Sequence, residues 1–268
     1  MVLLDGFSSY LLENGYTENT KRAYLRAVQL YSVYNAGKQP ESRGVQRFKA
    51  HLLETRTPAT VNLMLAGISK YCRFAGLNVS IRYVKVQRRT SIENVLTEQE
   101  VQLLLDALDA DGNIRLAAIV RLMAKTGARI SEVLRFRKCD LQRGFVDMQT
   151  KGKVRRIYFP KCLAAELRPL TESLSDGDML CRNRRGEQIT GSGVRKTLKR
   201  YAARCGIPPE HVHPHAFRHY YAVSFLRRNP NLALLADLLG HSGIGTTQIY
   251  LRMTQEQQQE EVDKTVDW

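Results

Sequence analysis

The sequence predicts a mainly helical protein of two domains, the second of which contains one small antiparallel β-sheet. Apolar residues recur at the three- and four-residue spacing of amphipathic helices over most of the 268 residues. Only one pair of strand-like runs stands out, and it surrounds a Lys-Gly-Lys turn near residue 152. A basic segment with weak periodicity, residues 86–95, separates two helical parts. We therefore expect domains at residues 1–85 and 96–268, joined by a linker.

The first domain is expected to be helical throughout. Helical spacing is clear in three runs, residues 7–16, 20–34 and 57–76. Thr17 is placed to cap the second helix, and Thr57 followed by Pro58 is a typical start for the third, because proline fits the first turn of a helix. Residues 1–90 hold 14 lysines and arginines against 5 acidic residues, which makes this the more densely basic part of the chain.

The second domain begins with a capping box. Thr97 caps the expected helix, and the side chain of Glu100 reaches back to it from three residues further on. The elements that follow are, in order, helices over residues 101–110 and 114–127, two strands within residues 144–160, and further helices from about residue 192 to the end. This order predicts a mixed α+β domain in which helices dominate.

Composition restricts the class of partner and the compartment. The net charge of +15 and the pI of about 9.8 indicate an anionic partner, with nucleic acid first and an anionic membrane second. No apolar run approaches the roughly 20 residues that span a bilayer, and the N-terminal residues lack the basic start of a signal peptide. Five widely spaced cysteines without a Cys-x-x-Cys pair are typical of reduced thiols in a cytosolic protein.

Four of the six histidines fall in the stretch HVHPHAFRH, residues 211–219. A helix would place His215 and His219 on one face, a spacing that also occurs in metal sites. A metal is disfavoured, however, because Arg218 lies between them and Glu210 is the only nearby carboxylate. The first turn of a helix also presents free N–H groups that attract an anion. Binding of a phosphate group and a purely structural role are therefore the two leading interpretations.

Two segments outside this cluster carry cations suited to a phosphate group. In TGARISEVL, Arg129 follows a glycine break and precedes an amphipathic helix, although a surface arginine paired with Glu132 would give the same pattern. In TKGKVRRI, Lys151 and Lys153 lie where a strand meets a turn. A lysine there is usually only solvated, but it can also swing over a bound phosphodiester.

The segment LLGHSGIGTTQIY supplies a histidine and a tyrosine. Gly240 ends an amphipathic helix and His241 follows it directly. Thr246 or Gly245 is placed to cap a short helix that carries Tyr250. A packing role is the ordinary alternative for one tyrosine among twelve.

Together and in this order, the four segments resemble the tyrosine recombinases of the phage-integrase family, and most of all its Xer-like members. The resemblance rests on TGARISEVL, on TKGK-x-RR before a strand, on HPHAFRH, and on LLGHSGIGTTQIY with its nine-residue step from His241 to Tyr250. It covers nearly the whole chain, although over the first 85 residues it is a resemblance of helical pattern only. The loop SGIG departs from the family, because many relatives have an acidic or polar residue and a serine there.

The resemblance implies roles for six residues. They are Arg129, Lys151, His215, Arg218, His241 and Tyr250. The tyrosine attacks a DNA phosphodiester, the two arginines bind the phosphate oxygens, and the lysine protonates the leaving 5′-oxygen. His215 is the expected acceptor of the tyrosine proton, and His241 the expected donor to the phosphate. Lys151 matches because it precedes Gly152 and stands five residues before Arg156, and Lys153 is its alternative. No metal or other cofactor is expected.

The implied fold is a SAM-like helical core-binding domain followed by the catalytic domain, which together form a C-shaped clamp on duplex DNA. The implied function is site-specific DNA recombination through a 3′-phosphotyrosyl intermediate and a Holliday junction, without metal or ATP, in the cytoplasm at the bacterial nucleoid. One alternative is a DNA-relaxing enzyme like the type IB topoisomerases, and another is a DNA-binding architectural protein that lacks catalysis. Dimer resolution, integration of a mobile element and cointegrate resolution all fit the pattern.

Double-stranded DNA and further copies of the chain are the expected partners. The basic residues expected to contact DNA are Lys21, Arg22, Arg26, Arg43, Arg47 and Lys153. The polar tail, residues 254–268, has two interpretations. It is either solvated, or a helix that docks on the next protomer of a tetramer through Val262, Val266 and Trp268.

Overall fold

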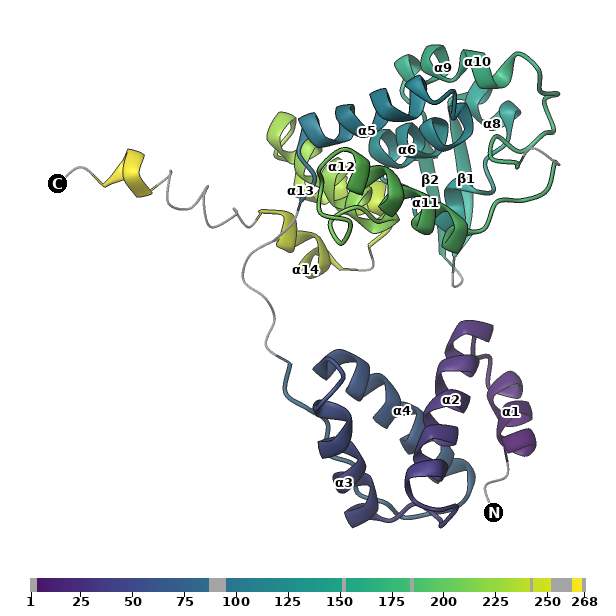
Figure 1. Ribbon diagram of the computed structural model, residues 1–268, viewed down its shortest axis with the longest axis vertical. Coiled ribbons are helices and arrows are strands. Elements are labelled where there is room, and N and C mark those ends of the chain that lie inside the picture. Colours follow the sequence, from purple (N-terminus) through teal and green to yellow (C-terminus); the bar gives the residue numbers. More distant parts are fainter. Residues whose placement is uncertain are drawn as a thin grey trace. The chain divides into compact units, whose positions relative to one another are not determined.

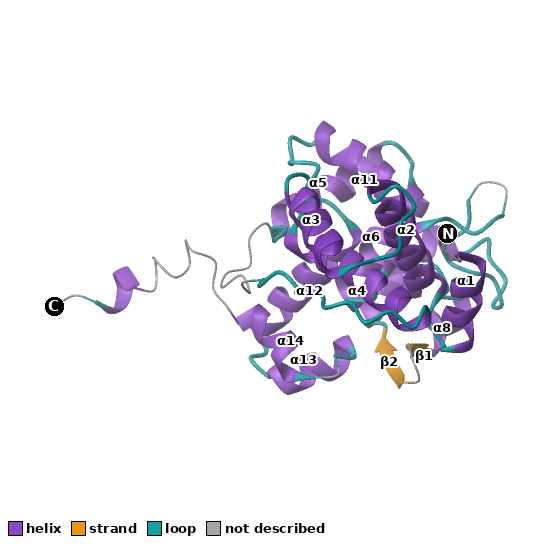
Figure 2. Ribbon diagram, turned by 90° about the horizontal axis from the view of Figure 1, so that it is seen from below, coloured by secondary structure: helices purple, strands orange, loops and turns teal. Residues whose placement is uncertain are grey.

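The computed structural model describes residues 4–86, 95–150, 153–183, 186–241, 243–251 and 262–266. The chain divides into two compact units, residues 1–88 and 89–268. The division falls inside the segment that the sequence predicts as a linker. Over the described residues the protein is mainly helical with one two-stranded antiparallel sheet, so the predicted fold class is confirmed (Figure 1 and Figure 2). No helix in these ranges is long and apolar enough to cross a membrane.

The described residues of the first unit, 4–86, form four helices. They are α1 (Leu4–Glu13), α2 (Glu18–Tyr34), α3 (Ser42–Leu53) and α4 (Pro58–Phe74). The predicted caps are confirmed, since the hydroxyls of Thr17 and Thr57 accept hydrogen bonds from backbone N–H groups at the starts of α2 and α4. Helix α3 was not predicted individually. It is amphipathic nonetheless, and its buried Phe48 packs against Tyr31 of α2 with ring centroids 5.3 Å apart.

The second unit contains most of the secondary structure. Its elements are α5 (Glu98–Ala110), α6 (Ile114–Thr126), α7 (Ile130–Val133), α8 (Lys138–Arg143), β1 (Phe145–Thr150), β2 (Lys153–Tyr158), α9 (Lys161–Glu166), α10 (Arg168–Thr171), α11 (Gly191–Arg204), α12 (Pro214–Arg228), α13 (Leu232–Leu239), α14 (Ile244–Thr247) and the 3₁₀ turn η1 (Gln248–Leu251). The capping box at the start of α5 is confirmed. Glu100 N donates to the Thr97 hydroxyl at 3.1 Å, and Thr97 N donates to the Glu100 carboxylate at 2.7 Å.

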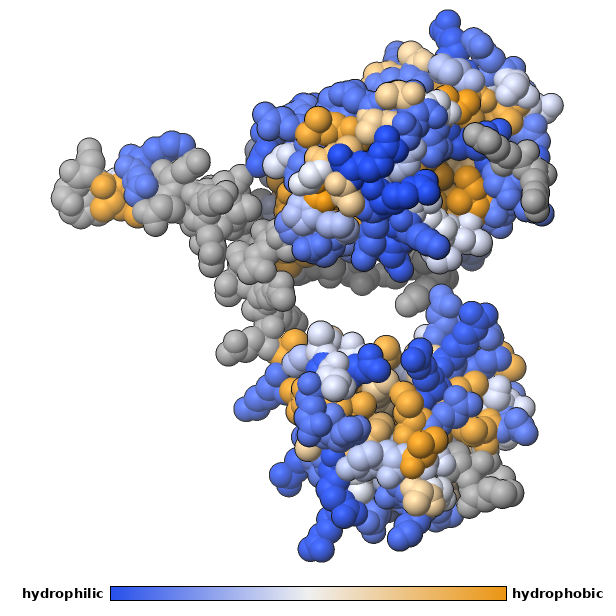
Figure 3. All heavy atoms as spheres, in the orientation of Figure 1, coloured by the Kyte–Doolittle hydropathy of each residue, from blue (hydrophilic) through white to orange (hydrophobic). Residues whose placement is uncertain are grey.

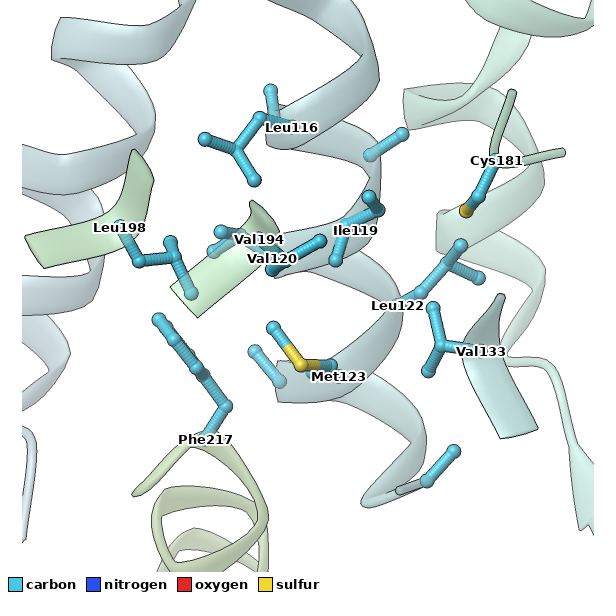
Figure 4. Packing of buried hydrophobic residues seen from close by; sticks show 14 of the residues in the cluster. Leu116, Ile119, Val120, Leu122, Met123, Val133, Cys181, Val194, Leu198 and Phe217 are labelled. Carbon is cyan, nitrogen blue, oxygen red and sulfur yellow. The ribbon is translucent and has the colours of Figure 1, made fainter. Parts of the chain in front are cut away.

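Helix α6 is the centre of the second unit. Its Ile119, Val120, Leu122 and Met123 are fully buried, so apolar side chains cover it on several sides. Figure 4 shows these residues among side chains of α7, α11 and α12. Phe217 of α12 lies on the side of Met123. Because α6 is packed on several sides, the segment that follows its C-terminus has a fixed position. That segment carries Arg129.

The β-hairpin has one face toward the core and one toward solvent. Met148 pairs with Arg155 and Val146 with Ile157, and Met148 and Ile157 are buried. Asp147 pairs with Arg156 on the exposed face. Because neighbouring residues of a strand point to opposite faces, Arg155 faces the interior while Arg156 does not.

The segment before Tyr250 differs in detail from the expectation. Gly245 and Thr246 do not precede the helix as caps, because α14 begins one residue earlier, at Ile244, and includes them. Tyr250 lies on the 3₁₀ turn η1 that continues α14. The cap assignment from sequence was therefore wrong. Periodicity over so short a run does not show where a helix begins.

Candidate active site

Arg218 is the most deeply buried charged side chain in the part of the chain that the structure describes, with 1% of its surface exposed. It lies in the first turns of α12, and its guanidinium group donates to two backbone carbonyls, Gly127 O at 2.9 Å and Leu239 O at 2.6 Å. It also lies 3.0 Å from Nε2 of His241. Burial, followed by the positive charges of Arg129 and Arg155, lowers the pKa of Arg218 to about 10. The group is still cationic at neutral pH.

His241 lies directly after the left-handed Gly240 that ends α13. Its Nδ1 atom is 2.8 Å from the hydroxyl of Thr247, which is fully buried. Burial, followed by the charge of Arg218, lowers the pKa of His241 to about 4. The imidazole is therefore neutral at physiological pH and is held from both of its nitrogens.

Tyr250 is buried beside these residues, with 6% of its surface exposed. Its ring lies 6.4 Å from that of His241, nearly parallel to it, and 5.4 Å from that of His219. Burial raises the pKa of Tyr250, while the charge of Arg218 and a hydrogen bond from it act in the opposite direction. The phenol is consequently neutral at pH 7 and must lose its proton to act as a nucleophile.

The clustered histidines have separate roles in the structure. His213 is the N-cap of α12, and its Nδ1 accepts from Ala216 N at 3.1 Å. The rings of His215 and His219 are 4.7 Å apart and perpendicular, and Nδ1 of His219 is buried without a hydrogen-bond partner among the described residues. Burial is the first cause of a lowered pKa in all three, and in His219 the pKa falls to about 4.

No metal-binding arrangement results from this cluster. Within the described residues, no three His, Cys, Asp or Glu side chains come together as metal ligands. The cap formed by His213 and the packing of His219 against Tyr250 direct these rings to different neighbours.

Arg129 and Arg155 share one carboxylate. Arg129 precedes α7, and its guanidinium donates to Glu132 Oε1 at 3.1 Å while its backbone N–H donates to Oε2 at 2.7 Å. Arg155 Nη2 donates to the same Oε2 at 2.7 Å, and Arg155 Nη1 to Leu238 O at 2.9 Å. The sequence suggested Glu132 only as a surface partner of Arg129. The structure makes Glu132 a buried bridge between α7 and the hairpin.

The hairpin shows which of two adjacent arginines reaches the site. The sequence match used Arg156 to place the lysine, but Arg156 faces outward, where it pairs with Asp147 at 2.8 Å and stacks on Phe145. Arg155 is the arginine that reaches the site. Adjacent arginines look equivalent in a sequence, and only the strand register separates them. Lys151 lies outside the described residues, and Lys153 is described only as the first residue of β2.

The DNA-binding candidates of the first unit lie on two helices. Lys21, Arg22 and Arg26 are on α2, and Arg43 and Arg47 are on α3. Arg22, Arg26, Arg43 and Arg47 are exposed. Lys21 is held against Glu18 at 3.0 Å with only 16% of its side chain exposed, which makes it the least available of the five.

One basic surface near the site was not singled out from the sequence. Helix α11 exposes Arg195, Lys196, Lys199 and Arg200, and Figure 3 shows strongly hydrophilic side chains gathered over this helix. After burial, the charges of Arg195 and Lys199 lower the pKa of His213, so this surface lies near the start of α12. Four cations within two turns of helix were the signal that could have revealed it.

The arrangement has the properties of an anion site with a nucleophile. The described site residues include three guanidinium groups, from Arg129, Arg155 and Arg218, but only one carboxylate, that of Glu132, which pairs with Arg129 and Arg155. The surplus positive charge favours a bound anion. Planar guanidinium groups match the oxygens of a phosphate, and the charge of one of them, Arg218, acts on the pKa of the Tyr250 hydroxyl against the larger effect of burial. Nucleophilic attack by a tyrosine on a phosphate ester is chemistry that this geometry supports.

The family model and the most similar relatives point to the same protein family. Residues 94–257 match the phage integrase family. The chain is 30% identical over 274 residues to tyrosine recombinase XerA of Pyrococcus furiosus, covering 98% of this chain and 93% of the relative. It is 32% identical over 264 residues to tyrosine recombinase XerA of Thermococcus kodakarensis, covering 95% and 92%.

Solved structures share the fold. A λ integrase (75–356) dimer bound to a COC′ core site matches with a TM-score of 0.75 at 17% identity, over 94% of each chain. The XerH site-specific recombinase bound to its palindromic difH substrate in a post-cleavage complex matches with a TM-score of 0.71 at 18% identity, over 91% of this chain and 78% of that one.

Proposed function

The chain belongs to the phage integrase family and is a tyrosine recombinase of the Xer type, and on this premise we propose that Tyr250 cuts and rejoins duplex DNA at specific sites. The observation that carries the proposal is the buried guanidinium of Arg218, which lies 3.0 Å from His241, whose ring in turn stacks beside that of buried Tyr250. A cation placed beside the phenol can hold the phosphate that the phenol attacks.

The reaction requires no net redox change and no external energy. The Tyr250 oxygen bonds to phosphorus as the bond to the 5′-oxygen breaks, which leaves a 3′-phosphotyrosyl link and a 5′-hydroxyl. Arg129 and Arg218 bind the non-bridging oxygens, whose negative charge grows in the transition state. Rejoining reverses these steps, because the covalent intermediate keeps the bond energy.

Two proton transfers accompany the cleavage. The Tyr250 phenol gives its proton to a histidine. His215 is the proposed acceptor, and His219 is a second candidate because its ring contacts both His215 and Tyr250. Burial, followed by neighbouring positive charges that include Arg218, lowers the pKa values of these histidines, and the negative charge of a bound phosphate would raise them again. Lys151 or Lys153 supplies a proton to the leaving 5′-oxygen.

Duplex DNA is the proposed substrate, and both units are proposed to contact it. The net charge of +15 supports this, as do the exposed cations of α2, α3 and α11. The related XerH and λ integrase structures contain DNA sites. The proposed setting is the cytoplasm, where the enzyme acts on chromosomal or mobile-element DNA.

A tetramer on two DNA sites is the proposed active assembly, with strands exchanged through a Holliday junction. The tail is the proposed link between protomers. Val262 and Val266 are 52% and 46% exposed, which leaves them available to a neighbour, while Trp268 lies outside the described residues. Deleting residues 254–268 should weaken recombination while sparing DNA binding, and unchanged recombination would remove this role for the tail.

A suicide substrate tests the function directly. Duplex DNA nicked close to the cleavage position traps the covalent intermediate, because the short 5′-hydroxyl fragment diffuses away. We expect a protein–DNA adduct with the wild type and with Tyr221→Phe, a matched control that removes a neighbouring, half-buried phenol, and no adduct with Tyr250→Phe. EDTA should leave the adduct unchanged.

The other outcomes separate the alternatives. If the protein binds DNA but neither the wild type nor any variant forms an adduct, it is a DNA-binding architectural protein without catalytic activity. Relaxation of supercoiled DNA without recombinant products would favour an enzyme of the topoisomerase kind.

A further inference from the structure

A continuous chain of hydrogen bonds joins the end of α6 to the turn that carries Tyr250. Gly127 O accepts from Arg218, Arg218 Nη2 contacts His241 Nε2 at 3.0 Å, and His241 Nδ1 contacts the Thr247 hydroxyl at 2.8 Å. Thr247 has no exposed surface. It stands three residues before Tyr250 on the continuous α14–η1 segment. This series of hydrogen bonds therefore ends within one helical turn of the proposed nucleophile.

The chemistry of the groups determines the direction of these hydrogen bonds. A guanidinium group has no acceptor atom, so Nε2 of His241 must accept from Arg218. A neutral imidazole carries one proton, which must then lie on Nδ1 and point to the oxygen of Thr247. The ring is neutral here because burial and the nearby arginines hold its pKa at about 4.

This tautomer is the wrong one for the proposed reaction. Nε2 faces Arg218 and is the nitrogen nearest the proposed phosphate position, yet without a proton it cannot donate to a phosphate oxygen. When a phosphate oxygen becomes the acceptor for Arg218 Nη2, Nε2 loses its donor. It can then carry a proton itself, provided that Nδ1, once deprotonated, finds a hydrogen-bond donor.

We propose that Thr247 is a positioning residue whose hydroxyl allows His241 to change tautomer when a DNA phosphate binds. A hydroxyl both donates and accepts. Thr247 accepts from Nδ1–H in the DNA-free state, and after rotation of its hydrogen it donates to bare Nδ1 in the complex. One proton passes from Nδ1 to water and one passes from water to Nε2, so the net charge of the ring is unchanged. This inference rests on the proposed function, because it needs a phosphate at Arg218.

Two substitutions at one position separate this role from packing. Thr247→Val keeps the shape and removes the hydroxyl, whereas Thr247→Ser keeps the hydroxyl. With the suicide substrate, we expect adduct formation by Thr247→Val to slow by about 10- to 100-fold, the usual range for losing a group that orients a site residue. Thr247→Ser should stay within about 3-fold of the wild type, since it retains the donor and acceptor. DNA affinity should change little in either variant, and both should remain folded with a lowered thermal unfolding midpoint, because Thr247→Val leaves a hydrogen-bond donor unpaired and Thr247→Ser removes a buried methyl group.

A spectroscopic measurement reports the tautomer itself. Ring ¹⁵N shifts of labelled histidine distinguish Nδ1–H from Nε2–H, and the signals of His241 are assigned by their loss in His241→Gln. We expect Nδ1–H in the DNA-free protein. In a complex of Tyr250→Phe with uncut DNA we expect Nε2–H, and we expect this change to be lost when Thr247→Val is added.

Each outcome bears on one proposal. Wild-type cleavage by Thr247→Val, equal losses in Thr247→Val and Thr247→Ser, or Nδ1–H retained in the DNA complex would each overturn the role of Thr247. Absence of an adduct from the wild-type protein would instead overturn the proposed function, and it would do so whatever the tautomer measurement shows.

Discussion

At the scale of single residues, burial changes the proton affinity of the site more than any one neighbouring charge does. It is the largest cause of the lowered pKa values of Arg218, His219 and His241, and of the raised pKa of Tyr250. All these shifts favour the neutral form. This buried cluster of cations therefore favours a ligand that supplies negative charge.

These shifts predict that the protein loses stability as the pH falls from about 6.5 to 4. His219 and His241 titrate near 4 in the folded protein and near 6.5 when unfolded. Within this window the unfolded chain binds more protons, so the free energy of unfolding decreases as the pH falls. His213 and His215, whose pKa values are also lowered, add to the same slope. Chemical denaturation at several pH values measures it.

Substitution shows which residues cause the slope. The double variant His219→Gln, His241→Gln should have a shallower dependence on pH than the wild type. Asp111 does not interfere, because its pKa of about 2 places its own contribution at lower pH. An unaltered slope in the double variant would contradict the assignment.

At the scale of elements, the C-terminal end of α13 is the junction of the site. Its last two carbonyls, Leu238 O and Leu239 O, accept from Arg155 and Arg218 respectively. Cations are favoured at this end of a helix, where carbonyl oxygens lack partners in the helix itself. The helix thereby joins the hairpin, α12 and the His241 segment in one buried network.

Gly240 allows the side chain of Arg155 to pack closely against the end of α13, so substitution of this glycine should be destabilising. It has a φ of +64°, and a Cβ atom there would lie 2.4 Å from Cδ of Arg155. We expect Gly240→Ala to destabilise the protein by about 2–4 kcal/mol, from the left-handed backbone plus the displaced arginine, and to slow adduct formation. Urea denaturation measures the first effect.

Gly144→Ala is the matched control. Gly144 also has a positive φ, +83°, but a Cβ atom there would meet nothing within 4 Å. It should cost only about 1–2 kcal/mol, the backbone contribution. Equal losses at the two glycines would show that contact with Arg155 contributes nothing.

At the scale of the whole molecule, positive charge is present on both units. The sequence placed it mainly in the first unit, and the structure adds the exposed cations of α11 in the second. Contacts with phosphates release counterions, so affinity for DNA should fall steeply with salt.

The α11 surface predicts a measurable change in that salt dependence. Replacing Arg195 and Lys199 with glutamine should weaken DNA binding and reduce the slope of log K against log salt by about 0.9 for each phosphate that the variant no longer binds. Arg168→Gln removes an exposed charge from α10 and should change neither quantity. Fluorescence anisotropy with labelled duplex at several salt concentrations measures the slope. An unchanged slope in the double variant would exclude α11 from the DNA interface.

The sequence by itself determined that the fold is mainly helical with one small sheet. It also determined the helix caps at Thr17, Thr57 and Thr97, and the protein family. These depend on local spacing and on motifs of a few residues, which survive without knowledge of the fold. Only the tertiary structure decided that Arg155 rather than Arg156 reaches the site, that Glu132 bridges two arginines, and that Thr247 holds His241. The reason is physical, because which side chain is buried depends on strand register and on contacts between segments far apart in the chain.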